Sequence, residues 1–268
     1  MKIKIYKPND LLKHYIQYYW VLENDKDSHT EFVYPTGEIQ ILFHYKKPFI
    51  EKKPDGSIIR QPQFALFGQR TDYSNIESSN DSGTIGIVFY PHSPSIFFSF
   101  PMNEINGYSI NLSDVCTEWK ILEERIAELN DNFLRIKNIE EYFIKKINLS
   151  NQHHYLQTQS VVKTINQSFG FDSIRSICNN YKMTEKSLQR LFHHYVGISP
   201  KKYSDIVRIN HAIKLLKTDK SFFDVTFESG FYDQAHFIRA LKKYTGYTPA
   251  ELKNLLIQCK MSDLYNED

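Results

Sequence analysis

Two sets of polar and basic side chains in the C-terminal half could read the edges of nucleic-acid bases. Their members recur at helical spacing: Glu185, Lys186, Gln189, Arg190 and His193 in the first set, and Asp233, Gln234, Ala235, Ile238, Arg239, Lys242 and Lys243 in the second. Arg and Gln can form paired hydrogen bonds with one base in the major groove, whereas Lys neutralises phosphate charge. The two sets therefore predict an interface for double-stranded DNA.

The charge distribution points to the same half of the chain. The 268 residues carry 33 Lys and Arg against 31 Asp and Glu, a formal net charge of +2. Residues 151–257 hold 15 of the basic and 8 of the acidic residues, an excess of seven positive charges, which leaves an excess of five negative charges elsewhere. Because only one half is basic, we expect only that half to meet a polyanion.

Both sets occur in copies of one local design. Residues 173–203 and 221–252 align with Ile177 opposite Val225 and with Arg190 opposite Arg239. In each copy we expect a short helix, a turn and a second helix that begins at an N-cap residue. The first copy has helices at 174–180 and about 184–195, with Thr184 as the N-cap. The second copy has helices at 223–229 and about 233–244, with Asp233 as the N-cap. This is the pattern of a helix-turn-helix unit, whose second helix enters the major groove.

An amphipathic helix over residues 201–217 is expected to connect the two units. Such a helix spans about 25 Å at 1.5 Å per residue. With packing at both ends, it could hold two recognition helices near the ~34 Å repeat of B-DNA.

Over residues 160–256 the sequence resembles the AraC/XylS family of regulators. The resemblance rests on residues 230–239 and 242–249 of the second unit, and on Arg208, Ala212 and Leu215-Leu216 in the connecting helix. The chain departs from the family pattern at Cys178 and Thr226, where Ala is usual, and at Lys182, where Gly is frequent. The resemblance implies an all-α DNA-binding domain over 155–258 and a transcription regulator, with activation and contact with RNA polymerase expected by analogy.

The N-terminal half is predicted to be β-rich. Short runs of β-branched and aromatic residues at 15–22, 39–44, 64–67 and 84–89 are separated by turn residues, which is typical of an antiparallel sandwich or barrel. Two amphipathic helices should follow over about 114–149, with Trp119, Leu122, Ile126 and Leu129 in the apolar stripe of the first. We expect this hairpin to be either core or the seam of a homodimer, and residues 149–159 to be a linker.

This half resembles, less specifically, the cupin-like sensor domains attached to such regulators. The matching residues are Trp20, Pro35, Gly37, Gly68, Phe89 and Pro91. The fold expected for the whole chain is therefore α+β with two domains, a regulatory and dimerisation domain over 1–150 and the DNA-binding domain.

Aromatic residues of the predicted strands could line a pocket for a small-molecule effector. The candidates are Trp20, Tyr34, Phe43, Phe67, Phe89 and, at the end of the last run, Tyr90. A plainly filled core is an equal alternative. Because Lys46-Lys47 and Lys52-Lys53 fall in an expected solvated loop, a ligand of this pocket should be uncharged or weakly polar.

Catalytic alternatives find less support in the sequence. A metal oxygenase in the N-terminal half needs two His and a carboxylate at one metal, but His14, His29, His44 and His92 lie on separate segments without a His-x-His pair. A DNA-repair fusion needs clustered reactive thiols, and Cys116, Cys178 and Cys259 are scattered. A protein that has lost DNA binding is disfavoured because Arg190 and Arg239 are both present. We therefore expect no enzyme activity, no metal and no cofactor.

Targeting signals are not apparent in the sequence. The first six residues lack the apolar stretch of a signal peptide, and no apolar run approaches the ~20 residues of a membrane helix. A cytoplasmic location without membrane contact is expected.

Overall fold

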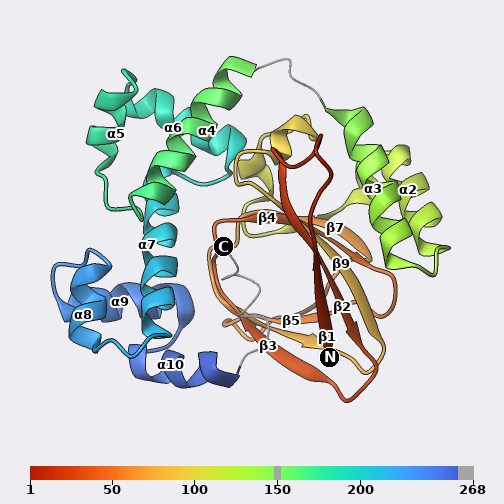
Figure 1. Cartoon of the computed structure of the whole chain (residues 1–268), viewed down its shortest axis with the longest axis horizontal. Coiled ribbons are helices and arrows are strands. Elements are labelled where there is room, and N and C mark those ends of the chain that lie inside the picture. Colours follow the sequence, from red (N-terminus) through yellow and green to blue (C-terminus); the bar gives the residue numbers. More distant parts are fainter. Residues whose placement is uncertain (148–151, 259–268) are drawn as a thin grey trace.

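The structure, a computed structural model, describes residues 1–147 and 152–258. In the N-terminal half, two antiparallel sheets face each other, and helices cover the rest (Figure 1). The six-stranded sheet has the order β1 (Lys2–Tyr6), β2 (Ile16–Asn24), β9 (Ser82–Phe89), β4 (Ile39–His44), β7 (Phe64–Phe67) and β10 (Ser109–Asn111). The four-stranded sheet has the order β3 (His29–Val33), β8 (Ser74–Ser78), β5 (Ile50–Lys52) and β6 (Ile58–Arg60). The predicted β-rich fold is confirmed.

The central strands of the six-stranded sheet are buried on both faces. Its central strand β9 has all eight residues buried. Side chains alternate along a strand, so Trp20, Leu42 and Val88 pack between the sheets, whereas Tyr19, Ile41 and Ile87 join the core shared with the helices. Gly86 lies opposite Trp20 in the register, and a Cβ atom at Gly86 would lie 2.0 Å from Trp20 Cε2. The position therefore requires glycine.

The predicted helical hairpin covers one face of this sheet. After the short α1 (Leu112–Val115), helices α2 (Thr117–Ala127) and α3 (Asn132–Lys146) contact each other. Trp119, Leu122 and Ile126 are buried, and Trp119 meets Phe64 of the sheet edge to face. These three residues of the predicted stripe are therefore core, whereas Leu129 lies beyond the end of α2 and is half-buried.

Phe133, in the first turn of α3, is 63% exposed although it is apolar. Arg135 takes the buried position at that end, where its Nε donates to Ile126 O and its guanidinium lies 3.9 Å from the Tyr45 ring centroid. Leu149 lies outside the described residues.

The prediction of a linker at 149–159 is wrong for residues 152–159. Residues 152–159 form the first turns of α4 (Gln152–Gln167), while 149–151 lie outside the described residues. Tyr155, Thr158 and Val162 are buried on one face of this helix. The many Gln and His side chains of this stretch occupy the remaining faces and concealed the apolar spacing.

The C-terminal half contains the two predicted helix-turn-helix units, one near each end of α7 (Figure 1). The helices are α5 (Ile174–Asn180), α6 (Glu185–Tyr195), α7 (Pro200–Leu216), α8 (Phe222–Glu228), α9 (Gln234–Thr245) and α10 (Pro249–Gln258). The observed boundaries of α7 and α8 differ from the predicted ones by one residue. Among the described residues, no helix is both long and apolar enough to cross a membrane.

We predict that Gly86→Ala lowers the free energy of unfolding by about 1–3 kcal/mol, because the added methyl group overpacks against Trp20. Trp20→Phe removes the atoms that the methyl group meets, so the double variant should be less destabilised than the sum of the two single changes. Urea unfolding of the four proteins measures this coupling. Strict additivity would show that the two residues do not meet as described.

Candidate nucleic-acid interface

The first helix-turn-helix unit is fixed by local hydrogen bonds. Ser173 and Thr184 cap α5 and α6, accepting hydrogen bonds from the backbone N–H groups of Ser176 and Ser187. In the turn, Lys182 adopts φ = +51°, and its counterpart Gly230 in the second unit adopts φ = +72°. Glycine reaches this conformation without steric cost, which gives a physical reason for the glycine expected here from the family resemblance, and Lys182 is a strained residue at this position.

Helix α6 presents two chemically different faces. Leu188, Leu191, Phe192 and Tyr195 are buried against the domain. Of the predicted set, Glu185, Lys186, Gln189 and Arg190 are exposed, whereas His193 is half-buried. The polar face thus lies on the outside, where a duplex could reach it.

Helix α9 repeats this arrangement. The Asp233 carboxylate accepts a hydrogen bond from the backbone N–H of His236 at 2.7 Å, so Asp233 is engaged as the predicted N-cap. Phe237, Leu241 and Tyr244 are buried. The other members of the second set are all exposed, namely Gln234, Ala235, Ile238, Arg239, Lys242 and Lys243.

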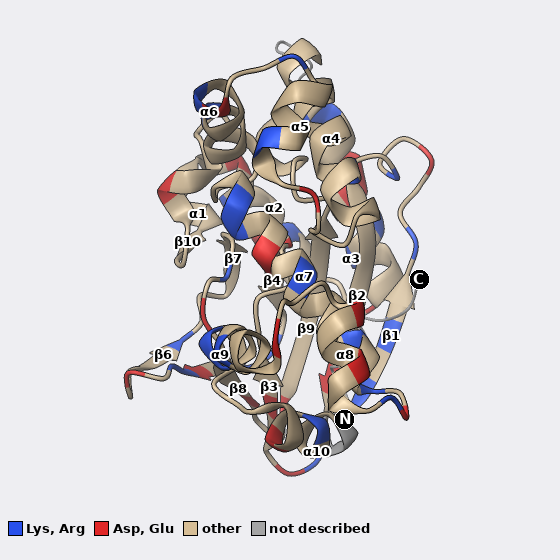
Figure 2. Ribbon diagram, turned by 90° about the vertical axis from the view of Figure 1, so that its left-hand side faces the viewer, with Lys and Arg blue, Asp and Glu red and all other residues tan. Residues whose placement is uncertain are grey.

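The two recognition helices lie toward the same side of the molecule, at opposite ends of α7 (Figures 1 and 2). A groove of about 330 Å³ between α7 and α9 gathers five basic side chains, Lys201, Arg208, His236, Arg239 and Lys243, beside Asp205. Lys201, Arg208 and His236 were absent from the predicted set. Lys201 and Arg208 belong to α7, so the spacing within α9 could not include them, whereas His236 lies in α9 itself and was missed.

Helix α6 also borders the N-terminal half. The 3₁₀ helix η2 (Met102–Ile105) contacts it. Pro101 and Asn103 line one side of a groove, and Gln189, Arg190 and His193 of α6 line the other side. The exposed face of the first recognition helix is therefore bordered by part of the other domain across this groove, a proximity that the sequence did not predict.

Of the aromatic residues proposed for a ligand pocket, three are packed in the core and three line cavities. Trp20 packs between the two sheets, and Phe43 and Phe89 pack on the face toward the helices. Tyr34 and Phe67 line a cavity of about 300 Å³ in the β domain. Tyr90 is 37% exposed and lines a second cavity between the β domain and α7.

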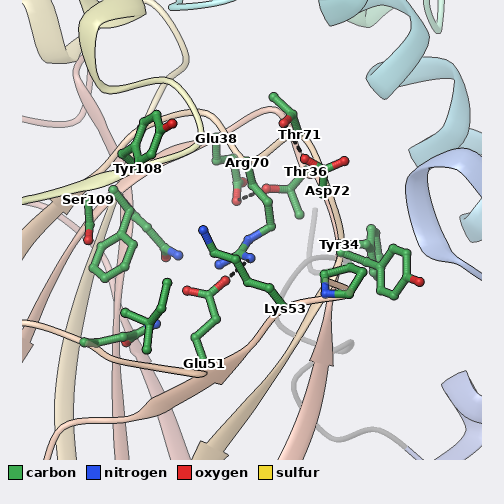
Figure 3. A pocket seen from close by; sticks show the side chains of 18 residues that line it. Tyr34, Thr36, Glu38, Glu51, Lys53, Arg70, Thr71, Asp72, Tyr108 and Ser109 are labelled. Atoms are coloured by element: carbon green, nitrogen blue, oxygen red, sulfur yellow. Dashed lines mark hydrogen bonds and ion pairs between the residues drawn. The ribbon is translucent and has the colours of Figure 1, made fainter. Parts of the chain in front are cut away.

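The 300 Å³ cavity is lined by charged groups, contrary to the expectation of a weakly polar pocket (Figure 3). Arg70 donates to Glu51 and to Ser74 at 2.6 Å each, and Ser74 donates to the same carboxylate. Lys53 is half-buried and lines the cavity, whereas Lys52 is exposed and pairs with Glu77. Lys53 lies in the turn that joins β5 to β6, as expected, but this turn places it at the cavity, where it is half-buried rather than solvated.

Glu38 lines both the 300 Å³ cavity and the second cavity toward α7. Burial raises the pKa of its carboxyl to about 7, against the lowering influence of hydrogen bonds from Thr36 and Gln17 and of the Lys214 charge. A carboxyl group in this state changes charge near neutral pH.

The four N-terminal histidines occupy separate environments. His44 bonds Thr84 and Gln61 inside the core, and burial lowers its pKa to about 4. His29 pairs with Glu31, and His14 is exposed. His92 differs from the expected surface or satisfied histidine, because it is buried with no hydrogen-bond partner for either ring nitrogen among the described residues. Within 1–147 and 152–258, no three His, Cys, Asp or Glu side chains gather closely enough to hold a metal ion.

Comparisons with known proteins match two separate parts of the chain. A helix-turn-helix domain family matches residues 177–254, and a domain family of unknown function matches residues 4–111. A transcriptional activator and DNA repair enzyme of Bacillus subtilis, AdaA, is 30% identical over 112 residues, which are 41% of this chain and 50% of that protein. The transcriptional activator RhaR of Yersinia pseudotuberculosis is 26% identical over 113 residues, 41% of this chain and 39% of that protein. The chain thus spans half or less of the length of these relatives.

Two solved structures are also similar. ToxT of Vibrio cholerae aligns over 95% of this chain and 98% of its own, with 12% identity and a TM-score of 0.45. A regulator of Rhodopseudomonas palustris described as a probable AraC family member aligns over 37% of this chain and 94% of its own, with 22% identity and a TM-score of 0.33.

We predict that Glu38→Gln makes the protein relatively more stable as the pH rises. A carboxyl whose pKa is higher in the folded than in the unfolded state favours folding below about 4.5, and this contribution is lost as the pH rises through about 7. The difference in Tm, variant minus parent, should therefore increase between pH 4.5 and 8. Glu104→Gln, at an exposed carboxylate, is the control and should leave the profile unchanged. A constant difference for Glu38→Gln contradicts the assignment.

Proposed function

This chain belongs to the AraC/XylS family of regulators, and we propose on that premise that it binds a specific sequence of double-stranded DNA to control transcription. The observation that carries the proposal is the pair of capped helices α6 and α9, each with a buried apolar face and an exposed polar face. Both expose an Arg at the equivalent position, Arg190 or Arg239. An Arg in the major groove can pair with guanine O6 and N7.

The spacing of the two units suits adjacent turns of one duplex. Helix α7 has 17 residues and is about 25 Å long. The recognition helices pack near its two ends and lie toward one side, so two successive major grooves about 34 Å apart are a natural target. The basic groove with Lys201 and Lys243 beside α9 is suited to a phosphate of the same duplex.

Further parts of the proposal follow the relatives. RhaR and AdaA are named activators, and we propose activation here, with RNA polymerase as a partner and the cytoplasm as the location. AdaA is also named a DNA repair enzyme. We propose that this chain has no such activity, since Cys178 is buried and Cys116 lies far from it in sequence, on a different domain.

Arg190→Ala and Arg239→Ala should each relax sequence preference in a different half of the bound site. The expected loss is about 1–3 kcal/mol of binding free energy for each, the value of a paired contact to one base. Competition binding against a library of single-base variants measures preference position by position.

Lys242→Ala and Lys243→Ala form the matched control on the same helix. They should weaken binding to all sequences about equally and reduce the dependence of affinity on salt, as the loss of a phosphate contact does. If both Arg variants keep the parent's preference at every position, the base-reading role assigned to these residues is wrong.

A homodimer through the hairpin α2–α3 is the proposed assembly. Since Trp119, Leu122 and Ile126 are core, the seam must use other side chains, and Ile121, Phe133 and Leu134 are exposed on these helices. We predict a dimer in sedimentation at micromolar concentration, and a monomer for Ile121→Asp combined with Phe133→Asp. A parent protein that is strictly monomeric with and without DNA rules out the seam.

A further inference from the structure

The walls of the 300 Å³ cavity are also the contacts between the two domains. Two segments of its rim, residues 34–38 and 70–73, line the cavity and also contact helices of the DNA-binding domain. A molecule in this cavity would therefore touch the same backbone that positions those helices.

The first rim segment packs on α7. Asn210 Nδ2 donates to Pro35 O at 3.0 Å, and a Cβ atom at Gly37 would lie 3.1 Å from Tyr203 Cε2. Inside the β domain, Gln69 Nε2 donates to Gly37 O at 2.8 Å. This turn is therefore held between the cavity side and the helix that connects the two DNA-binding units.

The second rim segment packs on the end of α9. A Cβ atom at Gly246, the C-cap of that helix, would lie 2.3 Å from Tyr73 Cζ. Phe32 meets Tyr247 edge to face at 5.2 Å between ring centroids. The charge of Asp72 also acts on Lys202 and Tyr244 of the DNA-binding domain. Movement of this segment would reach the second recognition helix directly.

The lining offers complementary charges within one small volume. Arg70 is oriented by Glu51 and Ser74, and Lys53 forms no ion pair among the described residues. Glu38 supplies a carboxyl group on the side toward α7. Tyr34, Phe67 and Tyr108 add aromatic surface to the lining, and Figure 3 shows Tyr34 and Tyr108 on opposite sides of the charged groups. A cavity of this volume is at the lower end of the range for small-ligand pockets.

We propose that this cavity binds a zwitterion of amino-acid size, with its anionic group at Lys53 and Arg70 and its ammonium group at Glu38, and that the ligand controls DNA binding through the two rim segments. The regulatory part rests on the proposed DNA-binding function. A ligand shifts the balance between domain arrangements only if it binds one of them more tightly. Contact with Glu38 at the joint to α7 provides that difference, because the position of this carboxyl depends on how the domains are packed.

The ligand is tested with the full-length protein in the absence of DNA. Isothermal titration is carried out with each of the twenty amino acids, and the binders are compared with their deaminated and decarboxylated analogues. We expect at least one amino acid to bind, and both analogues to bind at least tenfold more weakly. Binding by none of the twenty, or equal binding of either analogue, overturns the proposal.

Variants test two things separately, namely the position of the ligand site and the transmission of ligand binding to the DNA-binding domain. Lys53→Met and Glu38→Gln should each weaken binding of that amino acid at least tenfold, whereas Lys52→Met, at the neighbouring exposed lysine, should leave it unchanged. Asn210→Ala lies outside the 300 Å³ cavity and should keep ligand affinity while reducing the effect of the ligand on DNA affinity. Unchanged affinity in the Lys53 and Glu38 variants overturns the site. A ligand that binds without altering DNA affinity overturns only the proposed coupling between the cavity and the DNA-binding domain. Absence of DNA binding overturns the proposed function, while the result on ligand binding stands.

Discussion

Burial of the central strands of the six-stranded sheet on both faces is the constraint on which the rest of the structure depends. One face packs against the second sheet, and the other joins a core that runs through the hairpin α2–α3 into α4, α6 and α7. The DNA-binding helices are therefore not suspended on a free linker, and their positions are tied to the β domain. Any molecule that alters the rim of that domain acts on a packed joint, and packed joints switch between discrete arrangements rather than deform gradually.

The two helix-turn-helix units could be predicted from sequence almost to the residue, because their determinants are local. Thr184 and Asp233 cap their helices by accepting hydrogen bonds from backbone N–H groups three residues later. Because the unit is repeated, each position in one copy can also be checked against its counterpart in the other. The element missed here was α4, in which Gln and His concealed the spacing of Tyr155 and Thr158. The contact of η2 with α6 joins segments about ninety residues apart, and no local pattern encodes it.

The cavity was predictable only in part, for the same reason. Tyr34 and Phe67 line the 300 Å³ cavity, but aromatic composition could not separate them from Phe43 and Phe89, which belong to the other face of the sheet. Alternation in a strand fixes which residues share a face and leaves open which layer each face meets. The charged lining depends on pairing of β5 with β6 and β8, which brings Lys53 and Glu51 beside Arg70, and strand pairing is a long-range property.

If the two recognition helices of one chain read DNA together, the DNA that the protein selects must contain two blocks at a fixed spacing. Selection of genomic fragments by the purified full-length protein, followed by sequencing of the bound population, tests this directly. We expect one enriched motif made of two conserved blocks, with centres about one helical turn of 10–10.5 base pairs apart. A bound population with no enriched motif, or with a single block and no second one at that distance, would contradict it.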